Sequence, residues 1–464
     1  MKKQGEKMIG RTSELKYLNS FYEQNGSNLL VLYGQKDIGK TTILKEFTKG
    51  RPCHYHMARA CSEKEQLLSF CRNLDINILD KDKKIMAGSF LEAFTIAAEN
   101  DKSDKKILII DEFQNMVKTC SRFMEELVSF VKSREEKETV LVILCSSSIS
   151  WIENSMISKI GKAALSISGL YKVKELTFTD MRAYFPGFNL KESIEAYAIL
   201  GGVPGLWKYF DDSLSIKENI CRNILESTSP LHEEAQKCVT AELREASVYN
   251  TILAALASGK RKLNDLYNCT GFSRAKISVY LKNLMEREFV EKVFSYDSEG
   301  RNNTQKGIYR INSNYVDFYF NFLYHDGGKL FFMPSEEYYD SYIAPFFSKY
   351  TDGYFKKICM QNVEEKNRSD ELPFHYVKMG EWVGKDGNID LVAKDEKDNT
   401  LVGLCCWENP VMMLEDYNNL VVQIKKARMK ADYIFLFAKE GFETDLENVT
   451  AVQKNHVLIC SKEL

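Results

Sequence analysis

Three apolar runs in the N-terminal part of the chain each end in an abrupt polar or glycine-rich step. Residues 29–33 lead into a glycine-rich loop, residues 107–110 into two acidic residues, and residues 140–145 into three serines. Continuous apolar runs of this length are typical of strands that are buried on both faces, as in parallel sheets. The pattern therefore predicts an α/β domain built on a parallel sheet.

The middle of the chain changes to helical spacing. Apolar residues recur three or four positions apart between 249 and 285, with Gly271 between two short helical stretches and Ser273 placed to cap the second. A β-type stretch at 289–296 and a returning one at 308–311 follow, with a polar segment between them. This order predicts a winged helix-turn-helix, with the hairpin as its wing.

The C-terminal part is expected to form a helix, three strands, a second helix and a fourth strand, which is the core order of restriction-endonuclease-like domains. The predicted ranges are 350–365, 374–377, 388–393, 400–407, 412–430 and 433–438.

The loop after the first strand has the form GxxxxGK[ST], and a helical pattern follows it. In such a loop, backbone N–H groups and the helix N-terminus hold phosphate oxygens. Lys40 would reach the terminal phosphates, and the hydroxyl of Thr41 would bind Mg²⁺. A glycine turn without a ligand is the alternative. The expected nucleotide-binding residues of this loop are Gly34, Gln35, Lys36, Asp37, Ile38, Gly39, Lys40, Thr41 and Thr42.

The acidic pair after the second strand is expected at the same edge of the sheet as the loop. Asp111 is the expected magnesium-side ligand, while Glu112 points to the other side, where it could orient or deprotonate an attacking water. A helix cap after the strand is the alternative role of the pair.

These motifs resemble the prokaryotic AAA+/STAND-type ATPases known as the archaeal ATPase family. The resemblance rests on Gly10-Arg11 with Glu14-Leu15, on GQKDIGKTT, on LIIDEFQ and on ILGGVPGLW at 199–207. It implies ATP and Mg²⁺ as cofactors and a helical lid that includes 199–207. It also implies that Arg11 lies near the adenine, with a helix-start residue as its other role. The resemblance further implies a sensor of the γ-phosphate at the end of the third strand, where the candidates, or ordinary turn formers, are Ser146, Ser147 and Ser148.

One departure from this family concerns an arginine. Family members often carry Gly-Arg where this chain has Gly169 followed by Leu170. An arginine at this kind of site stabilises transition-state charge in phosphoryl transfer, so slow ATP hydrolysis is expected. The basic side chains that could substitute are Lys172, Lys174 and Arg182.

Residues 380–409 resemble the C-terminal domain that accompanies this ATPase family. Nuclease chemistry there needs an aspartate on one strand and E-x-K on the next, to hold Mg²⁺ and to assist the attacking water. Asp390 takes the first position, but Leu404 and Cys406 stand where glutamate and lysine are expected. The upstream helix offers Lys356, where a glutamate is often found. One carboxylate holds a catalytic magnesium poorly, so an inactive nuclease-like domain is expected. The alternative is an active site restored by displaced groups, for which the candidates are Glu381, Glu408, Lys425 and Lys426.

The second helix of the helix-turn-helix is the candidate DNA-binding element. Its basic positions are Arg274, Lys276 and Lys282, although glutamates between 286 and 291 dilute the positive charge nearby. A net charge of about −2 excludes a bulk attraction of the whole chain to nucleic acid or membrane. Double-stranded DNA and a protein partner are both left open as ligands of this module.

Length and composition set the domain count and the compartment. The 464 residues are divided into a P-loop ATPase core at 1–175, a helical lid at 176–240, a winged helix-turn-helix with its connector at 241–325 and a restriction-endonuclease-like domain at 326–464. Scattered cysteines, no signal segment and no long apolar run predict a cytoplasmic protein without a membrane span. In many ATPases of this class a neighbouring subunit completes the site, so an oligomer is left open.

The expected fold class is thus a multidomain α/β protein with a P-loop NTPase sheet, a helical lid, a winged helix and a nuclease-like domain. The leading functional hypothesis is an ATPase switch that hydrolyses ATP slowly. The alternatives are a DNA-binding regulator or adaptor that holds nucleotide structurally, and an ATP-dependent nuclease.

Overall fold

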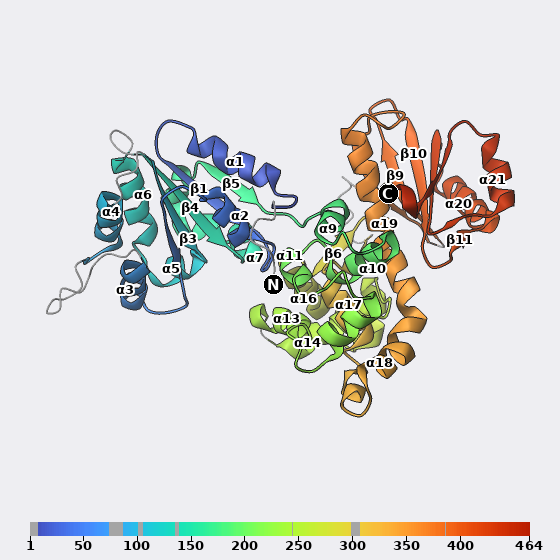
Figure 1. Ribbon diagram of the computed structural model, residues 1–464, viewed down its shortest axis with the longest axis horizontal. Helices are drawn as coiled ribbons and strands as arrows, with labels where there is room; N and C mark the ends of the chain where they lie inside the picture. Colours follow the sequence, from blue (N-terminus) through green and yellow to red (C-terminus); the bar gives the residue numbers. More distant parts are fainter. Residues whose placement is uncertain are drawn as a thin grey trace. The chain divides into compact units, whose positions relative to one another are not determined.

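The computed structural model divides the chain into two compact units (Figure 1). Unit 1 comprises Met1–Glu175 and Val203–Gly205, and unit 2 comprises Leu176–Gly202 and Leu206–Leu464. The short peptide Val203–Gly205 thus belongs to unit 1, although both of its flanking segments belong to unit 2. The residues that the structure describes are 8–73, 87–100, 105–134, 139–243, 245–297, 307–385 and 387–464.

Unit 1 is built on a five-stranded sheet in the order β2-β3-β4-β1-β5. All neighbouring strands run parallel, as the apolar runs predict. β4 lies between β1 and β3, so the ends of these three strands meet at one edge of the sheet. The strands are β1 Asn28–Tyr33, β2 Cys53–Met57, β3 Lys105–Asp111, β4 Thr139–Ser146 and β5 Gly169–Lys172.

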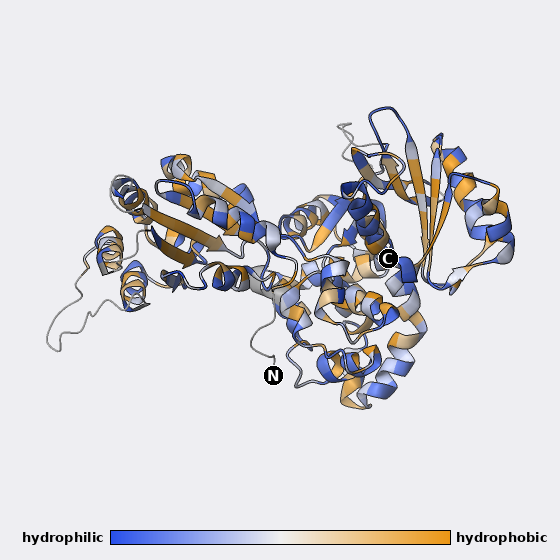
Figure 2. Cartoon of the chain, turned by 45° about the horizontal axis from the view of Figure 1, so that its top comes forward, coloured by the Kyte–Doolittle hydropathy of each residue, from blue (hydrophilic) through white to orange (hydrophobic). Residues whose placement is uncertain are grey.

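Helices cover both faces of this sheet, which explains why its central strands carry apolar residues on both faces. Leu29 and Val31 of β1 pack into one hydrophobic layer, while Leu30 and Leu32 pack into the other. Figure 2 shows the apolar strands of this sheet enclosed by helices of mixed character. The helices are α1 Thr12–Tyr22, α2 Lys40–Phe47, α3 Glu63–Asn73, α4 Phe90–Asn100, α5 Gln114–Thr119, α6 Phe123–Ser133, α7 Ile149–Asn154, α8 Met156–Ile160 and the 3-10 helix η1 Gly161–Ser166.

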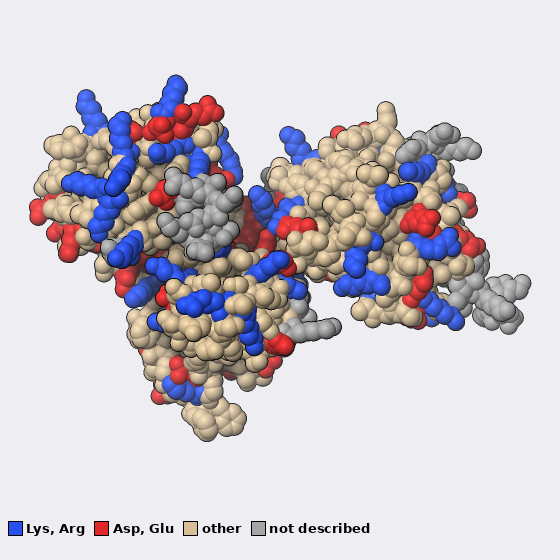
Figure 3. Space-filling model, turned by 180° about the vertical axis from the view of Figure 1, so that it is seen from behind, with Lys and Arg blue, Asp and Glu red and all other residues tan. Residues whose placement is uncertain are grey.

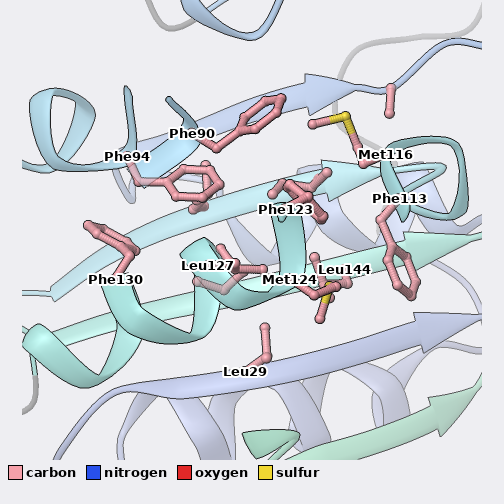
Figure 4. Close-up of a cluster of buried hydrophobic side chains, with 14 of the residues drawn as sticks. Leu29, Phe90, Phe94, Phe113, Met116, Phe123, Met124, Leu127, Phe130 and Leu144 are labelled. Atoms are coloured by element: carbon pink, nitrogen blue, oxygen red, sulfur yellow. The ribbon is translucent and has the colours of Figure 1, made fainter. Parts of the chain in front are cut away.

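An aromatic cluster fixes one of these layers. Phe90 and Phe94 of α4 pack against Phe123 and Phe130 of α6, with ring centroids 5.5 Å apart for Phe90–Phe123 and 5.4 Å apart for Phe94–Phe130 (Figure 4). All four rings are at most 3% exposed. Edge-to-face and offset aromatic pairs of this kind add to the stabilisation from buried area.

The first part of unit 2 is helical. Capping boxes begin α9 at Thr177, α10 at Asn189 and α12 at Ser215, so local polar side chains define where these helices start. The elements are α9 Phe178–Tyr184, α10 Leu190–Leu200, α11 Pro204–Trp207, α12 Ile216–Ile220, the π-helix η2 Cys221–Leu225 and α13 Glu234–Glu242.

Three helices and an antiparallel two-stranded ribbon follow, in the predicted order. They are α14 Ala246–Ala257, α15 Leu263–Thr270, α16 Arg274–Glu286, β6 Val290–Val293 and β7 Ile308–Ile311. The expected cap of α16 is confirmed, since the Ser273 hydroxyl accepts a hydrogen bond from the Lys276 N–H at 3.2 Å. Most of the polar segment between the strands, residues 298–306, lies outside the described residues.

A long helix, α19, joins the parts of unit 2. The side-chain Oε1 of Gln361 accepts from the N–H of Phe178 at 2.9 Å, and the Tyr350 hydroxyl donates to the backbone carbonyl of Ala198 at 3.1 Å. These contacts attach α9 and α10 to the C-terminal part. The connecting elements are α17 Asn314–Phe322, the 3-10 helix η3 Gly327–Phe331, α18 Ser335–Tyr338, the π-helix η4 Tyr339–Ile343 and α19 Ala344–Arg368.

The C-terminal part contains a mixed five-stranded sheet in the order β14-β12-β10-β9-β8. β8, β9 and β10 pair antiparallel, whereas β10, β12 and β14 pair parallel. The elements are β8 Lys378–Val383, β9 Asn388–Lys394, β10 Thr400–Cys406, β11 Val411–Met412, α20 Leu414–Ala427, β12 Tyr433–Ala438, β13 Gly441–Phe442, α21 Thr444–Ala451, β14 His456–Cys460 and the 3-10 helix η5 Ser461–Glu463.

The strand predicted at 374–377 is wrong, because β8 begins only at Lys378. The backbone of Tyr376 bonds to a side chain instead of a neighbouring strand. Its N–H donates to Oδ1 of Asn367 at 3.0 Å, and its carbonyl accepts from Nδ2 of the same residue at 3.3 Å. The apolar side chains of this segment therefore mark a loop packed on the domain, not a strand.

The long helix α19 and the other described helices lack the combination of length and apolar character that a membrane span requires.

Candidate functional site

Lys40 opens α2 and turns back into the glycine-rich loop. Its ammonium donates to the carbonyl oxygens of Gly34 at 2.8 Å and Gln35 at 3.0 Å. The residue is only 8% exposed, and burial lowers its pKa, while the nearby carboxylates of Glu112 and Asp111 oppose that shift. The ammonium thus lies inside the loop, where phosphate oxygens would replace the two carbonyls as its partners.

Two contacts hold the loop from outside. The N–H of Gly205 donates to the Asp37 carbonyl at 3.0 Å, and Nη2 of Arg11 donates to the Ile38 carbonyl at 2.6 Å. In a planar trans peptide, the carbonyl and the N–H point in opposite directions. Holding the Ile38 carbonyl therefore turns the N–H of Gly39 to the opposite side of the backbone, as a phosphate-binding loop requires, while the N–H of Ile38 donates to the Gln35 carbonyl at 3.4 Å.

Arg11 is a buried residue at the start of α1 that makes three hydrogen bonds through its guanidinium group. Besides the Ile38 contact, its Nη1 pairs with Oε1 of Glu14 at 2.9 Å and donates to the Lys174 carbonyl at 2.7 Å. The residue is 4% exposed. The expected position beside the adenine stays a prediction, and the structure adds a role that the motif did not indicate, namely support of the loop backbone.

The peptide Val203–Gly205 lies directly on the loop. A Cβ atom at Gly205 would come within 2.4 Å of the Asp37 Cβ, and one at Gly39 would come within 3.4 Å of the Pro204 Cγ. The sequence pattern GGVPG indicated only a turn in a helical lid. No spacing rule links this peptide to a loop more than 160 residues away, so its place at the site was not predicted.

Because Gly205 leaves no room for a side chain, we expect Gly205→Ala to weaken ATP binding. The added methyl group displaces the Asp37 backbone and removes its outward hydrogen bond, which costs about 1–3 kcal/mol, or roughly 5- to 150-fold in affinity. Titration calorimetry checks this, with Gly353→Ala in α19 as the control. Neither Gly205 nor Gly353 has a left-handed φ, but no atom lies within 4 Å of the Cβ position of Gly353. Equal ATP affinity of Gly205→Ala and wild type would show that the contact does not support the loop.

The acidic pair ends β3, and its two carboxylates have different partners. Asp111 accepts from the Tyr55 hydroxyl at 2.7 Å through Oδ2 and from the Glu112 N–H at 3.0 Å through Oδ1. Glu112 accepts from the Gln114 side chain and from the Ser147 N–H through Oε2. The backbone of Glu112 has a φ of 53°, a left-handed conformation that costs a non-glycine residue about 1–3 kcal/mol. The sequence did not mark Tyr55, because no motif contains it, and it gave no role to Gln114, the last residue of LIIDEFQ.

The three candidate sensor serines have distinct places. The Ser146 side chain is fully buried, and its hydroxyl accepts from the Ser148 N–H at 3.1 Å, as in an ordinary turn. The Ser146 carbonyl accepts from the Gly34 N–H at 3.3 Å, which joins β4 to the loop. Ser147 lies next to Glu112 through its N–H. All three therefore lie at the site, and which of them senses phosphate stays a prediction.

A magnesium ion bound together with ATP fits these residues. Thr41 is exposed on the first turn of α2, and Asp111 supplies a carboxylate. Among the described residues, no cluster of three or more Asp, Glu, His or Cys side chains could hold a metal by itself. This suits Mg²⁺, which is usually bound through one or two protein oxygens and the phosphates of the nucleotide.

The position of the missing arginine is open to solvent. Leu170 on the edge strand β5 is 50% exposed. Of the possible substitutes, Lys172 pairs with Glu153 at 2.9 Å, Lys174 contributes its carbonyl to Arg11, and Arg182 donates to the Leu464 carbonyl at 2.7 Å inside unit 2.

In the C-terminal sheet, Asp390 is paired with a lysine. Lys356 of α19 places its ammonium 3.2 Å from Oδ1 of Asp390 and 2.7 Å from Oε2 of Glu381, and Oδ2 of Asp390 accepts from the Cys405 N–H at 3.1 Å. Burial alone would raise the pKa of Glu381, but Lys356 and Arg310 hold it below the usual value. The cation between these carboxylates is thus an ammonium of the chain itself.

Leu404 and Cys406 contribute packing at this place. Both are partly buried against a hydrophobic cluster that includes Leu420 and Ile424 of α20. Since neighbouring residues of a strand point to opposite faces, Cys405 faces the other layer, the one that contains α19. The structure therefore brings Asp390 together with Lys356 and Glu381, and it shows no polar side chain at positions 404 and 406.

Comparisons with known proteins agree with the site in unit 1. Residues 8–210 match a family described as an ATPase domain predominantly from Archaea, and residues 319–423 match a family of archaeal and bacterial proteins of unknown function. The chain is 26% identical over 399 residues to the uncharacterized protein MJECL04 of Methanocaldococcus jannaschii, which covers 84% of this chain and 85% of that protein.

Two further similarities are shorter or more remote. A segment of 43 residues is 35% identical to the uncharacterized ATP-binding protein MJ0423 of the same organism and covers 9% of this chain and 73% of that protein. The solved structure of the Walker-type ATPase PABY2304 of Pyrococcus abyssi superposes with a TM-score of 0.51 at 18% identity, over 68% of this chain and 96% of that one. This likeness concerns the fold alone. Residues 8–210 of this chain are thus similar to an ATPase domain, and the parallel sheet with its glycine-rich loop has the architecture of a P-loop fold.

Proposed function

We propose that this protein is an ATP-dependent molecular switch that hydrolyses ATP slowly. The observation that carries the proposal is the convergence of the buried ammonium of Lys40 and the carboxylates of Asp111 and Glu112 at one edge of the sheet. A cation inside the loop and two carboxylates beside it are the groups that phosphoryl transfer from a magnesium nucleotide requires.

Each group has a separate role in this proposal. Lys40 and the loop N–H groups bind the phosphates, and Arg11 and Gly205 keep the loop in shape. Thr41 and Asp111 hold Mg²⁺, which, when bound, neutralises the charge that develops on the phosphate oxygens. Glu112 orients the attacking water and accepts its proton.

Slow turnover is part of the proposal for two reasons. Leu170 stands where an arginine would stabilise the transition state. In addition, Oε2 of Glu112 accepts from the Gln114 side chain and from the Ser147 N–H, so mainly Oε1 is left to accept a proton from the attacking water.

A steady-state ATPase assay tests the proposal. We expect magnesium-dependent hydrolysis on the order of 10⁻⁴–10⁻³ s⁻¹, the range of a nucleotide hydrolase without an arginine at the transition state. Tightly bound nucleotide with no measurable turnover would instead favour the alternative class, a regulator or adaptor that holds nucleotide structurally.

The second candidate function is binding of double-stranded DNA by a winged helix-turn-helix formed by α14–α16, β6 and β7. Its favouring observation is the exposed, basic start of α16. Arg274 stacks on the Tyr267 ring at 4.1 Å and donates to Asn264 at 3.0 Å, and the Lys282 side chain is 73% exposed. Figure 3 shows basic and acidic side chains interspersed on the visible face, so any DNA contact must be local.

The ribbon formed by β6 and β7 contacts the C-terminal sheet at β8. The Tyr296 N–H donates to the Glu381 carbonyl at 2.7 Å, and the Ser295 hydroxyl accepts from the Val383 N–H at 2.9 Å. Arg310 of β7 also pairs with Glu381 at 2.7 Å. The ribbon and the start of the segment between its strands are therefore attached to β8, and α16 is the element that we expect to meet DNA.

Replacement of the three basic residues of α16 tests this function. If each of these three residues contacts a phosphate, the plot of log association constant against log salt concentration becomes less steep by about 0.9 per residue removed. A binding titration with duplex DNA at several salt concentrations measures the slope, and an unchanged slope would contradict the assignment. The test variant combines Arg274→Ala, Lys276→Ala and Lys282→Ala, and the control combines the exposed lysine changes Lys191→Ala, Lys208→Ala and Lys397→Ala.

We further propose that the C-terminal mixed sheet is an inactive nuclease-like domain used for binding. The support is the ammonium of Lys356, which lies between the carboxylates of Glu381 and Asp390. No cleavage of DNA is therefore expected with Mg²⁺ or Mn²⁺. Metal-dependent cleavage that disappears in Asp390→Ala would contradict this and support the third hypothesis, an ATP-dependent nuclease.

A further inference from the structure

The edge strand β2 places one tyrosine at the acidic pair. Tyr55 is the parallel partner of Ile109 on β3, and Asp111 is two residues further along on the same face of that strand. The tyrosine side chain is long enough to span this diagonal, and its hydroxyl donates to Oδ2 of Asp111 at 2.7 Å. A second contact fixes the strand here, because the Ala58 N–H donates to the Asp111 carbonyl at 2.9 Å.

The side chain of Tyr55 is held in place at its ring. The ring is partly buried against the hydrophobic layer that contains Ile107 and Ile109. Because an ionised carboxylate can only accept hydrogen bonds, the hydroxyl at the end of this ring is the donor in its contact with Asp111.

The carboxylate of Asp111 is consequently held from both sides. Tyr55 holds Oδ2, and the Glu112 N–H holds Oδ1 at 3.0 Å. An ionised carboxylate has about four acceptor positions, so two of them stay available for a cation or for water bound to it. If the hydroxyl were removed, only the Glu112 N–H would restrain rotation of the carboxylate.

We infer that Tyr55 is a positioning residue that orients Asp111 toward the magnesium ion of a bound nucleotide. The inference rests on the proposed function, because it takes Asp111 as the metal-side ligand. Outer residues that hydrogen-bond to metal ligands fix the orientation of those ligands, and their loss typically lowers metal affinity by about 10–100-fold.

The test compares nucleotide binding by wild type and Tyr55→Phe with and without Mg²⁺. The phenylalanine keeps the ring and removes only the hydroxyl. The dissociation constant of a fluorescent ATP analogue is measured in Mg²⁺ and in EDTA, using the full chain. We expect the gain in affinity from Mg²⁺ to fall by about 10-fold and the affinity in EDTA to stay within about twofold. The Mg²⁺ concentration that gives half-maximal ATP hydrolysis should rise by a similar factor, with the maximal rate restored at high Mg²⁺.

Two control variants make the result decisive. Tyr22→Phe changes a tyrosine of the same hydrophobic layer. It should alter neither the affinity measured in Mg²⁺ nor the affinity measured in EDTA. Asp111→Asn removes the charge of the ligand itself and should abolish most of the gain from Mg²⁺. A gain that is unchanged in Tyr55→Phe but lost in Asp111→Asn would overturn the inference and leave the proposed function intact. If Mg²⁺ increases the affinity equally in wild type, Tyr55→Phe and Asp111→Asn, or does not increase it even in wild type, then Asp111 has no metal role and the inference fails with it.

Discussion

Lys40→Ala is expected to weaken ATP binding by about 100-fold, since a charged donor to the phosphates is worth up to about 3 kcal/mol. The ammonium of Lys40 is buried in the loop, and its present partners are the two carbonyls of Gly34 and Gln35. Alanine cannot replace the ammonium, because its side chain has no hydrogen-bond donor. Among the described residues, Lys40 is the cation that contacts the carbonyls of Gly34 and Gln35. Titration calorimetry with ATP and Mg²⁺ measures the loss.

Lys45→Ala is a matched control for this experiment. Lys45 belongs to the same helix, α2, but it is exposed in the last turn. The control should bind ATP as wild type does. Equal affinities of all three proteins would remove Lys40 from the binding site.

Glu112→Gln is expected to keep ATP bound and to lower the rate of hydrolysis by about 10²–10³-fold, within the usual contribution of a general base. Glutamine preserves the length of the side chain and can still accept from the Ser147 N–H, so the strained backbone of residue 112 keeps its support. It cannot accept a proton from the attacking water. Single-turnover hydrolysis, measured with enzyme in excess over ATP, separates this effect from changes in binding.

Glu125→Gln provides the comparison for that measurement. Glu125 is an exposed glutamate in the first turn of α6, and its replacement should leave the rate unchanged. If Glu112→Gln and wild type hydrolyse ATP at the same rate, Glu112 is not the base, and the reading of the protein as a structural nucleotide holder gains support.

The sequence predicted the central sheet of unit 1 because the relevant signals are local. Each of β1, β3 and β4 is a continuous apolar run, and the loop at 34–41 needs only its glycines, its lysine and the strand before it. The residues that support the site were not predictable in this way. Tyr55, Arg11 and Gly205 reach the loop and the acidic pair from segments that only the fold brings together.

The C-terminal part was harder to predict for a related reason. Residues 374–377 have the composition of a strand, but Asn367 takes the backbone hydrogen bonds of Tyr376, and β8 begins only at Lys378. The edge strand β14 was missed because its residues are mostly half-exposed and its apolar run is only four residues long. Likewise, the substitution pattern at 404 and 406 indicated a lost metal site, but it did not indicate that Lys356 would pair with the remaining aspartate.

In a switch, the bound nucleotide controls the state of the protein, here its assembly. Native mass spectrometry of the purified chain, incubated with ATP and then with ADP, reports nucleotide occupancy and assembly mass together. If the protein is a switch, we expect that bound ATP and ADP exchange with nucleotide in solution. We also expect that the distribution of assembly masses differs between ATP and ADP. Permanently bound ADP, with the same distribution in both conditions, would contradict it.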